Sequence, residues 1–177
     1  MYLISIYFDE KTNIQISNYI RAVENATGNN FMTENNVPPH ITIAAFETRN
    51  ENKAIEVFDE IVKNVPCGEI NWVTHGAFGH SVIYIAPVLN EYLHNLSMIG
   101  NEEFNHQEEI KLINKYQPFN WLPHATIGKT LTKEQQLIAF QTLQNNFGIF
   151  NSIVTSIGLA RTNPFKNLRL FMLDESK

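Results

Sequence analysis

A short motif occurs twice in this chain and constrains the fold more than any other feature of the sequence. The first copy reads Pro-His-Ile-Thr-Ile from Pro39, and the second reads Pro-His-Ala-Thr-Ile from Pro123. In a strand, side chains at positions i and i+2 share a face, so each copy presents an imidazole and a hydroxyl on one side and apolar groups on the other. We therefore expect two equivalent strands, one from each half of the chain, to meet at one cleft.

The polar faces of the two copies supply the candidate catalytic residues, which are His40, Thr42, His124 and Thr126. A single histidine on a half-exposed strand is usually structural, but core packing does not require two copies in equivalent contexts. A neutral imidazole can take a proton from water, an imidazolium can donate one to a leaving oxygen, and hydroxyls can bind phosphoryl oxygens. This set is typical of phosphodiester cleavage, and the chemistry requires neither a metal nor a cofactor.

Patterns in the rest of the chain predict an α+β fold. Strands are expected at residues 1–8, 40–47 and 121–130, and hairpins at 69–86 and 151–173 favour antiparallel pairing over a doubly wound sheet. Helical spacing or capping signals predict helices across residues 16–27, 54–65, 87–96, 109–116 and 132–147. The length of 177 residues suits one domain spanning 1–177.

Composition excludes several classes of function. A net charge of −5 argues against a broad electrostatic grip on duplex nucleic acid, which relies on many Lys and Arg contacts. Cys67 is the sole cysteine, so neither an internal disulfide nor a cysteine-based zinc site is expected. The apolar start is short and runs into Asp9 and Glu10, so we expect no signal peptide, no membrane span and a cytoplasmic location. We expect a monomer.

The sequences PHITI and PHATI resemble the paired His-x-Thr-x motifs of the 2H phosphoesterase superfamily. The resemblance is to its LigT-like branch, also called 2′-5′ RNA ligase or RNA 2′,3′-cyclic phosphodiesterase, and it extends over most of the chain. It implies a bilobal α+β fold with pseudo-two-fold symmetry, antiparallel sheets flanked by helices, and one motif strand per lobe. It also implies that His124 is the base, His40 the acid, and a 2′-phosphate the product formed from an RNA end or a small nucleotide.

Three further side chains are candidates for binding the substrate. Phe78 lies near a hairpin tip and Trp121 just before the second motif, so either ring is placed to stack on a base, with core packing as the alternative. Arg161 is a candidate phosphate ligand by analogy, with an ion pair as the alternative. Lys129 lies an odd number of positions past His124, so on a regular strand it faces away from the site.

The same residues are compatible with other functions. The same site suits hydrolysis or formation of 2′-5′ phosphodiester linkages, or action on a cyclic phosphate of a nucleotide sugar. A non-catalytic RNA-binding module would use the cleft as a phosphate pocket. If the repeat were coincidental, His40 and His124 would lie far apart in the structure.

Overall fold

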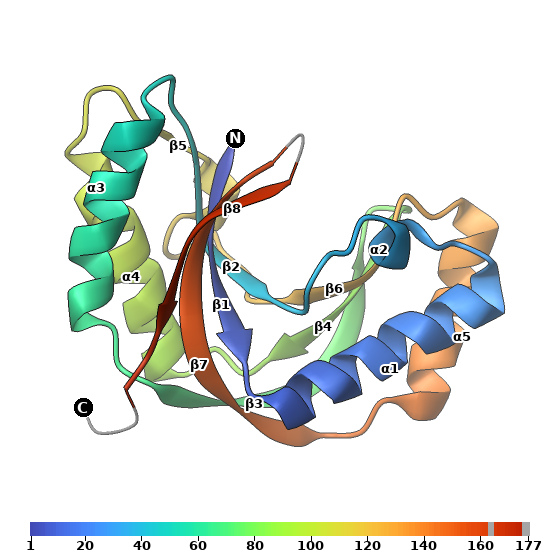
Figure 1. Cartoon of the computed structure of the whole chain (residues 1–177). Coiled ribbons are helices and arrows are strands. Elements are labelled where there is room, and N and C mark those ends of the chain that lie inside the picture. Colours follow the sequence, from blue (N-terminus) through green and yellow to red (C-terminus); the bar gives the residue numbers. More distant parts are fainter. Residues whose placement is uncertain (163–164, 175–177) are drawn as a thin grey trace.

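The structure is a computed structural model that describes residues 1–162 and 165–174, apart from the side chain of Asn64 (Figure 1). It confirms the α+β class, with antiparallel pairing in every strand pair of the described chain. The eight strands form one continuous sheet in the order β5-β2-β1-β7-β3-β4-β6, with β8 also paired to β7. They are β1 (Tyr2–Phe8), β2 (Ile41–Glu47), β3 (Gly68–Phe78), β4 (Val82–Pro87), β5 (Lys111–Leu112), β6 (Ala125–Lys129), β7 (Phe150–Arg161) and β8 (Lys166–Met172).

The long strand β7 joins the two ends of the sheet. Residues 150–154 pair with β3, and residues 154–161 pair with β1 along the opposite edge. Past residue 154, the edge of β7 that pairs with β3 pairs instead with β8, through residues 156–161. One lobe therefore contains β5, β2, β1 and β8, the other contains β3, β4 and β6, and β7 belongs to both (Figure 1).

Helices cover the outer face of each lobe (Figure 1). The helices are α1 (Glu10–Thr27), α2 (Phe31–Glu34), α3 (Glu51–Ile61), α4 (Glu91–Asn105) and α5 (Lys133–Asn146), with short 3₁₀ turns at η1 (Val62–Asn64) and η2 (Asn114–Tyr116). Helix α1, from the first half, packs on α5 and β6, whereas α4, from the second half, packs on β2. Each motif strand is thus supported by a helix from the other half of the sequence.

Local capping interactions define where the helices begin and end. Asp9 accepts from the backbone N–H of Thr12 at the start of α1, and Gly28 ends that helix with φ 69°, a backbone angle that glycine adopts without strain. Thr132 and Gln135 form the predicted capping box of α5. These contacts satisfy backbone groups that the first and last turns leave unpaired.

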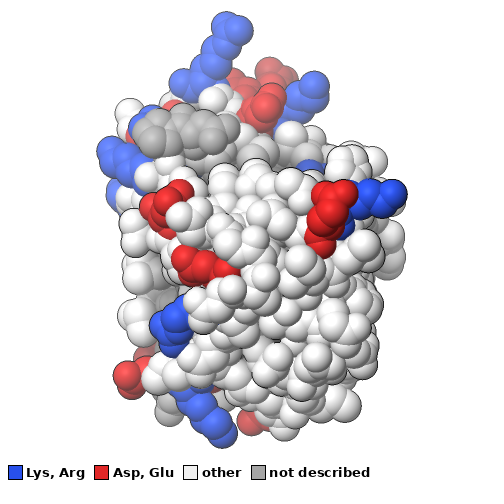
Figure 2. Space-filling model, turned by 90° about the vertical axis from the view of Figure 1, so that its right-hand side faces the viewer, with Lys and Arg blue, Asp and Glu red and all other residues white. Residues whose placement is uncertain are grey.

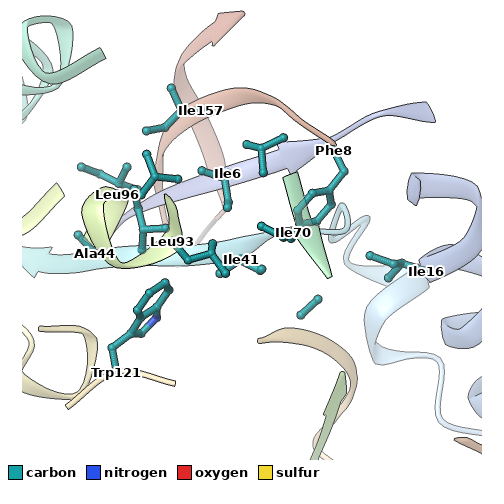
Figure 3. Packing of buried hydrophobic residues seen from close by; sticks show 14 of the residues in the cluster. Ile6, Phe8, Ile16, Ile41, Ala44, Ile70, Leu93, Leu96, Trp121 and Ile157 are labelled. Atoms are coloured by element: carbon teal, nitrogen blue, oxygen red, sulfur yellow. The ribbon is translucent and has the colours of Figure 1, made fainter. Parts of the chain in front are cut away.

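The core lies between the sheet and these helices. Figure 3 shows Ile6 of β1 and Ile41 of β2 packed near Leu93 and Leu96 of α4, with Trp121 approaching from the loop before β6. All five side chains are buried. The alternation in β1 is clear, since Ile4, Ile6 and Phe8 are fully buried on the helix side.

Some expected elements differ from the observed ones. Residues 109–116 form the short strand β5 and the turn η2 instead of a helix, because β5 adds to the edge of β2. Pro87 ends β4 and does not open a helix, and Asn90 caps α4 one residue before it begins. Helix α2 was not predicted. Among the described helices, none is long and apolar enough to cross a bilayer.

Candidate active site

Both motif histidines are held by the same local hydrogen bond. Nδ1 of His40 lies 2.7 Å from the carbonyl oxygen of Pro38, and Nδ1 of His124 lies 2.8 Å from that of Leu122. A carbonyl oxygen can only accept, so Nδ1 carries the proton in each neutral ring and Nε2 carries the lone pair. Each Nε2 is therefore in the form that can accept a proton from a substrate or water.

The two imidazoles are close enough to interact electrostatically. Burial lowers the pKa of His124 below its ordinary 6.5, the bond to Leu122 opposes this, and the charge of His40 lowers the pKa further. Burial also lowers the pKa of His40, against the opposing effect of its bond to Pro38. In Figure 1 the starts of β2 and β6 approach each other at the concave centre of the sheet. The arrangement brings together the two histidines that the repeat predicted.

The motif threonines differ in their surroundings. Thr42 is buried, and its hydroxyl lies 3.3 Å from the hydroxyl of Ser5 on β1. Thr126 is half-buried, and its hydroxyl has no hydrogen-bond partner within the described residues. The Thr126 hydroxyl is therefore free to bind an incoming oxygen.

A β-bulge follows the threonine in each motif strand. Ser5 pairs with Thr42 but Ile4 pairs with Ala44, so Ile43 is the extra residue in β2. Tyr84 pairs with Thr126 but Ile83 pairs with Gly128, so Ile127 is the extra residue in β6. An extra residue reverses which positions share a face.

The bulge in β6 corrects the expectation that Lys129 faces away from His124. Lys129 pairs with Val82, which is two residues from the Thr126 partner Tyr84 on β4, so Lys129 and Thr126 share a face. The charge of Lys129 lowers the pKa of His40. Its ammonium group also lies 5.5 Å from the centre of the Phe31 ring of α2.

A second lysine acts on the other histidine. Lys115 lies in η2, which is tied to β2 by a 2.8 Å hydrogen bond from Ile113 N to Ala45 O. Its charge lowers the pKa of His124. The pKa of each histidine is therefore lowered by the positive charge of a lysine from the opposite lobe.

Aromatic rings surround the histidines. Phe78 lies edge-on to His124 with ring centres 4.7 Å apart, and it stacks on Tyr84 at 4.3 Å. Tyr84 lies 5.5 Å from His124. On the other side, the Tyr7 ring is 6.2 Å from His40, and burial raises the pKa of Tyr7 to about 12, so its hydroxyl stays protonated.

Comparison with known proteins identifies the family. The sequence matches the profile described as the 2'-5' RNA ligase superfamily over residues 13–164. The chain belongs to the 2'-5' RNA ligase superfamily. A comparison with curated proteins gives no match.

Solved structures share the fold of this 2'-5' RNA ligase superfamily member. LigT of E. coli in complex with 3'-AMP is 14% identical, with 97% of each chain covered and a TM-score of 0.62. A structure described as a phosphoesterase is 15% identical, with 97% of each chain covered and a TM-score of 0.63. TT0787 of Thermus thermophilus is 13% identical, with 99% of each chain covered and a TM-score of 0.63. The bilobal fold expected from the paired motifs is therefore that of the superfamily.

Of the side chains expected to bind substrate, one lies beside the histidine pair of this superfamily member. Phe78 contacts His124 and is 38% exposed, so part of the ring can meet a ligand. Trp121 is only 8% exposed, and its indole N–H donates to the carbonyl of Thr42 at 2.9 Å. Trp121 therefore positions the first motif strand, and its buried ring offers little surface for a base.

Arg161 lies elsewhere in the molecule. It forms an ion pair with Glu51 at 3.1 Å, which was the alternative to phosphate binding. It is five residues along β7 from Ser156, which pairs with Tyr7 next to His40. That separation corresponds to about 17 Å along a strand, beyond the reach of a guanidinium to the imidazole pair.

Five residues near the histidines were missed or misplaced from the sequence, among them Lys115, whose effect on His124 no sequence pattern indicated. Ser5 and Tyr7 alternate along β1, a signal that could have been used once β1 was paired with β2. Tyr84 becomes visible only from the β3–β4 register, and Lys129 only from the bulge. In the described chain, no three His, Cys, Asp or Glu side chains gather in a metal-binding arrangement.

Proposed function

We propose that this protein hydrolyses 2′,3′-cyclic phosphates at RNA ends or on nucleotides to 2′-phosphates, using His40 and His124 as the acid and base. The proposal rests above all on the duplicated Nδ1 hydrogen bonds, which leave the Nε2 atom of each ring available for proton transfer. Core packing alone does not require that arrangement twice. The proposed site is the whole set of His40, Thr42, His124 and Thr126 within one domain of residues 1–177.

The proton transfers follow from the tautomers. With the roles that the family resemblance implies, Nε2 of His124 takes a proton from water as the hydroxide attacks phosphorus. The bond from phosphorus to the 3′ oxygen breaks, and the proton on Nε2 of the His40 imidazolium moves to that oxygen. The product keeps the phosphate on the 2′ oxygen. Each proton transfer contributes about 10²–10⁴-fold to such reactions, and the chemistry needs no metal or cofactor.

The surrounding groups suit the charge that develops on the phosphoryl oxygens. Thr126 presents a hydroxyl without a described partner, and Thr42 presents one shared with Ser5. Lys115 and Lys129 add positive charge near the two imidazoles. Donors and cations that are already in place stabilise charge without reorganising during the reaction. An anionic substrate also raises the lowered pKa values of the histidines, which favours the protonated acid.

A short substrate fits the charge distribution. The net charge is −5, and on the face turned to the viewer in Figure 2 the described Lys and Arg side chains are scattered and form no continuous basic patch. Nucleotides are also bound by LigT, whose structures contain 3'-AMP, ATP and NADP+. We therefore propose a nucleotide or an RNA end as the partner and a monomer as the working unit.

The family description favours one alternative activity at the same site. A 2'-5' RNA ligase joins ends through the 2′ oxygen, and ligation is cleavage run in reverse with the two histidines exchanging roles. A nucleotide-sugar cyclic phosphate is a further candidate substrate of the same chemistry. A non-catalytic RNA-binding module would keep the pocket and lose turnover, so substitution of either histidine would weaken binding only.

An assay in EDTA tests the proposal. A 2′,3′-cyclic mononucleotide and a short RNA with a 2′,3′-cyclic end are incubated with the protein, and products are separated to distinguish 2′- from 3′-phosphates. We expect a 2′-phosphate from both. Folded protein that turns over neither substrate would refute hydrolysis, and joining of a 2′,3′-cyclic end to a 5′-hydroxyl end without hydrolysis would favour the ligase.

A further inference from the structure

Two exposed apolar side chains lie on the edge strand β8. Leu170 is 63% exposed and Met172 is 65% exposed. They are two residues apart, so they share one face of the strand. Adjacent exposed apolar side chains on one face of a strand can mark a site that binds a ligand or another protein.

The strand register places this face on the same side of the sheet as the motif threonine Thr42. Leu170 pairs with Gly158, Gly158 with Ser5, and Ser5 with Thr42. Directly paired residues point to the same side of a sheet. The row therefore runs across four strands from the motif threonine to Leu170.

A second row runs parallel to the first and starts at the motif histidine. Met172 pairs with Ser156, and Ser156 pairs with Tyr7, whose ring lies next to that of His40. Apart from His40 and Tyr7, the eight positions of the two rows contain no ionisable side chain. Strand β8 also carries Lys166 and Arg169, which pair with Arg161 and Leu159 and so lie on the opposite face. Arg169 forms an ion pair there with Asp59 of α3.

Gly158 lets the tyrosine and leucine approach each other. A Cβ at Gly158 would lie 3.0 Å from the Tyr7 ring and 3.5 Å from the Leu170 side chain, so both side chains cover this position. The Tyr7 ring therefore fills the space between His40 and β8. Tyr7 and Leu170 thus lie over Gly158, and Met172 lies two residues along β8 on the same face. We call Tyr7, Leu170 and Met172 the apolar shelf.

We propose that the apolar shelf binds a nucleobase of the substrate that lies beyond the nucleotide carrying the reacting phosphate. This inference rests on the proposed function and specifies its substrate as an oligonucleotide end. Strand β8 is three strands from β2, or about 14 Å at about 4.8 Å per strand. That span is about four times the 3.4 Å rise between stacked bases, so a single nucleotide at the histidines falls short of Leu170 and Met172, the part of the shelf on β8.

The chemistry of the shelf suits the flat face of a base. Every base has an uncharged π-face, and such faces stack on apolar and aromatic surfaces with little sequence preference. A phosphate would find no cation among the eight positions of the two rows except a protonated His40 at their far end. The shelf is therefore a determinant of substrate length, and the histidines determine the chemistry.

The test compares substrate lengths in the full chain. The double variant Leu170→Ser with Met172→Ser is assayed on a trinucleotide with a 2′,3′-cyclic end and on a 2′,3′-cyclic mononucleotide. We expect the preference for the trinucleotide, taken as the ratio of kcat/KM values, to fall about tenfold, in line with the loss of one stacked base. Phe171→Ser is the matched control, because Phe171 lies between the two residues and on the opposite face.

A binding measurement separates failure of the shelf from failure of the proposed function. The dissociation constant of a trinucleotide ending in a 2′-phosphate is measured by calorimetry for both variants, which needs no turnover. An unchanged ratio and an unchanged dissociation constant in the double variant would overturn the shelf while leaving hydrolysis intact. A dimer that the double variant disrupts, with unaltered nucleotide binding, would overturn it in favour of a contact between two copies of the chain.

Discussion

Strands β2 and β6 hold their histidines in the same way but surround them with different side chains. In both strands a proline precedes the histidine, a carbonyl two residues earlier fixes Nδ1, and a bulge follows the threonine. The position five residues after the histidine is Lys129 in β6, whereas in β2 it is Ala45. The hydrogen bond that orients the imidazole is the same in both strands, whereas the side chains around the imidazole differ.

The difference provides a physical basis for opposite roles. His40 lies beside the tyrosine ring of Tyr7, and its threonine is buried against Ser5. His124 lies between Phe78 and Tyr84, and its threonine is half-buried without a described partner. Two imidazoles in identical settings would have the same intrinsic pKa, whereas these different settings can separate an acid from a base.

The largest effect is expected from removing either imidazole. His40→Ala or His124→Ala should each lower kcat on a 2′,3′-cyclic nucleotide by about 10²–10⁴-fold, because each removes one proton transfer. The double variant should lose much less than the product of the two effects, since the histidines act as a unit. Steady-state kinetics in EDTA measures this, with His106→Ala, an exposed histidine at the end of α4, as the control. A loss of less than tenfold at one histidine would mean that only the other is catalytic.

The next effect concerns the link between the two strands. Trp121→Phe removes the donor to the Thr42 carbonyl and leaves a buried oxygen without a partner, which should cost about 1–3 kcal/mol in the free energy of unfolding. Urea denaturation measures the loss, and kcat should also fall because β2 begins directly after His40.

Trp72→Phe is the matched control for that experiment. Its indole N–H donates to the hydroxyl of Ser152, also deep in the core but outside the motif strands. We expect a comparable loss of stability without a change in kcat. Equal effects of both substitutions on kcat would show that Trp121 acts through stability alone.

A smaller effect is expected from the aromatic contact to His124. Phe78→Leu should lower kcat/KM by about 2–10-fold, which corresponds to an aromatic contact of about 0.5–1.5 kcal/mol. Phe140→Leu provides a close match, because Phe140 lies edge-on to His75 at the same 4.7 Å and is similarly exposed. If both substitutions change kcat/KM equally, the contact of Phe78 with His124 has no special role.

The smallest effect is expected in the pH dependence. Both histidine pKa values lie below 6.5 in the free protein, and a bound anion raises them, so the bell-shaped profile of kcat should lie at higher pH than that of kcat/KM. Lys129→Ala should raise the pKa of His40 and Lys115→Ala that of His124, because each removes a nearby positive charge. The two variants should move different limbs of the kcat/KM profile to higher pH.

An exposed lysine of α5 supplies the control for the pH measurement. Lys133→Ala should move neither limb, since Lys133 lies in the first turn of that helix. If Lys115→Ala and Lys129→Ala move the same limb, the crossed arrangement of lysines and histidines is wrong.

The sequence was sufficient for those features that depend on short-range pattern. The capping box of Thr132 and Gln135, the end of α1 at Gly28 and the antiparallel class follow from local chemistry, and all are observed. The motif repeat also predicted that His40 and His124 would interact, because pseudo-symmetry brings equivalent strands together. Each of these signals, including each copy of the repeat, is a pattern of only a few residues.

Features set by pairing between distant segments were not predictable. The face on which Lys129 lies depends on a bulge that only the partner strand β4 reveals. From the sequence, Trp121 could be a stacking ring or a core residue. The deciding contact is its hydrogen bond to the Thr42 carbonyl, 79 residues away. Arg161 required knowledge of which end of β7 meets the histidines. In each case the deciding contact lies far along the chain.

The pairing of β1 with β7 has a consequence for how the protein becomes active during synthesis. Tyr7, which lies beside His40, pairs with Ser156, so the β1 side of the first histidine is completed only after residue 156 has been synthesised. Until then, β1 keeps one edge open, and long-range pairing of this kind forms slowly. A nascent chain that ends before residue 150 contains both histidines but lacks β7, so the β1 side of the proposed site has no strand to pair with.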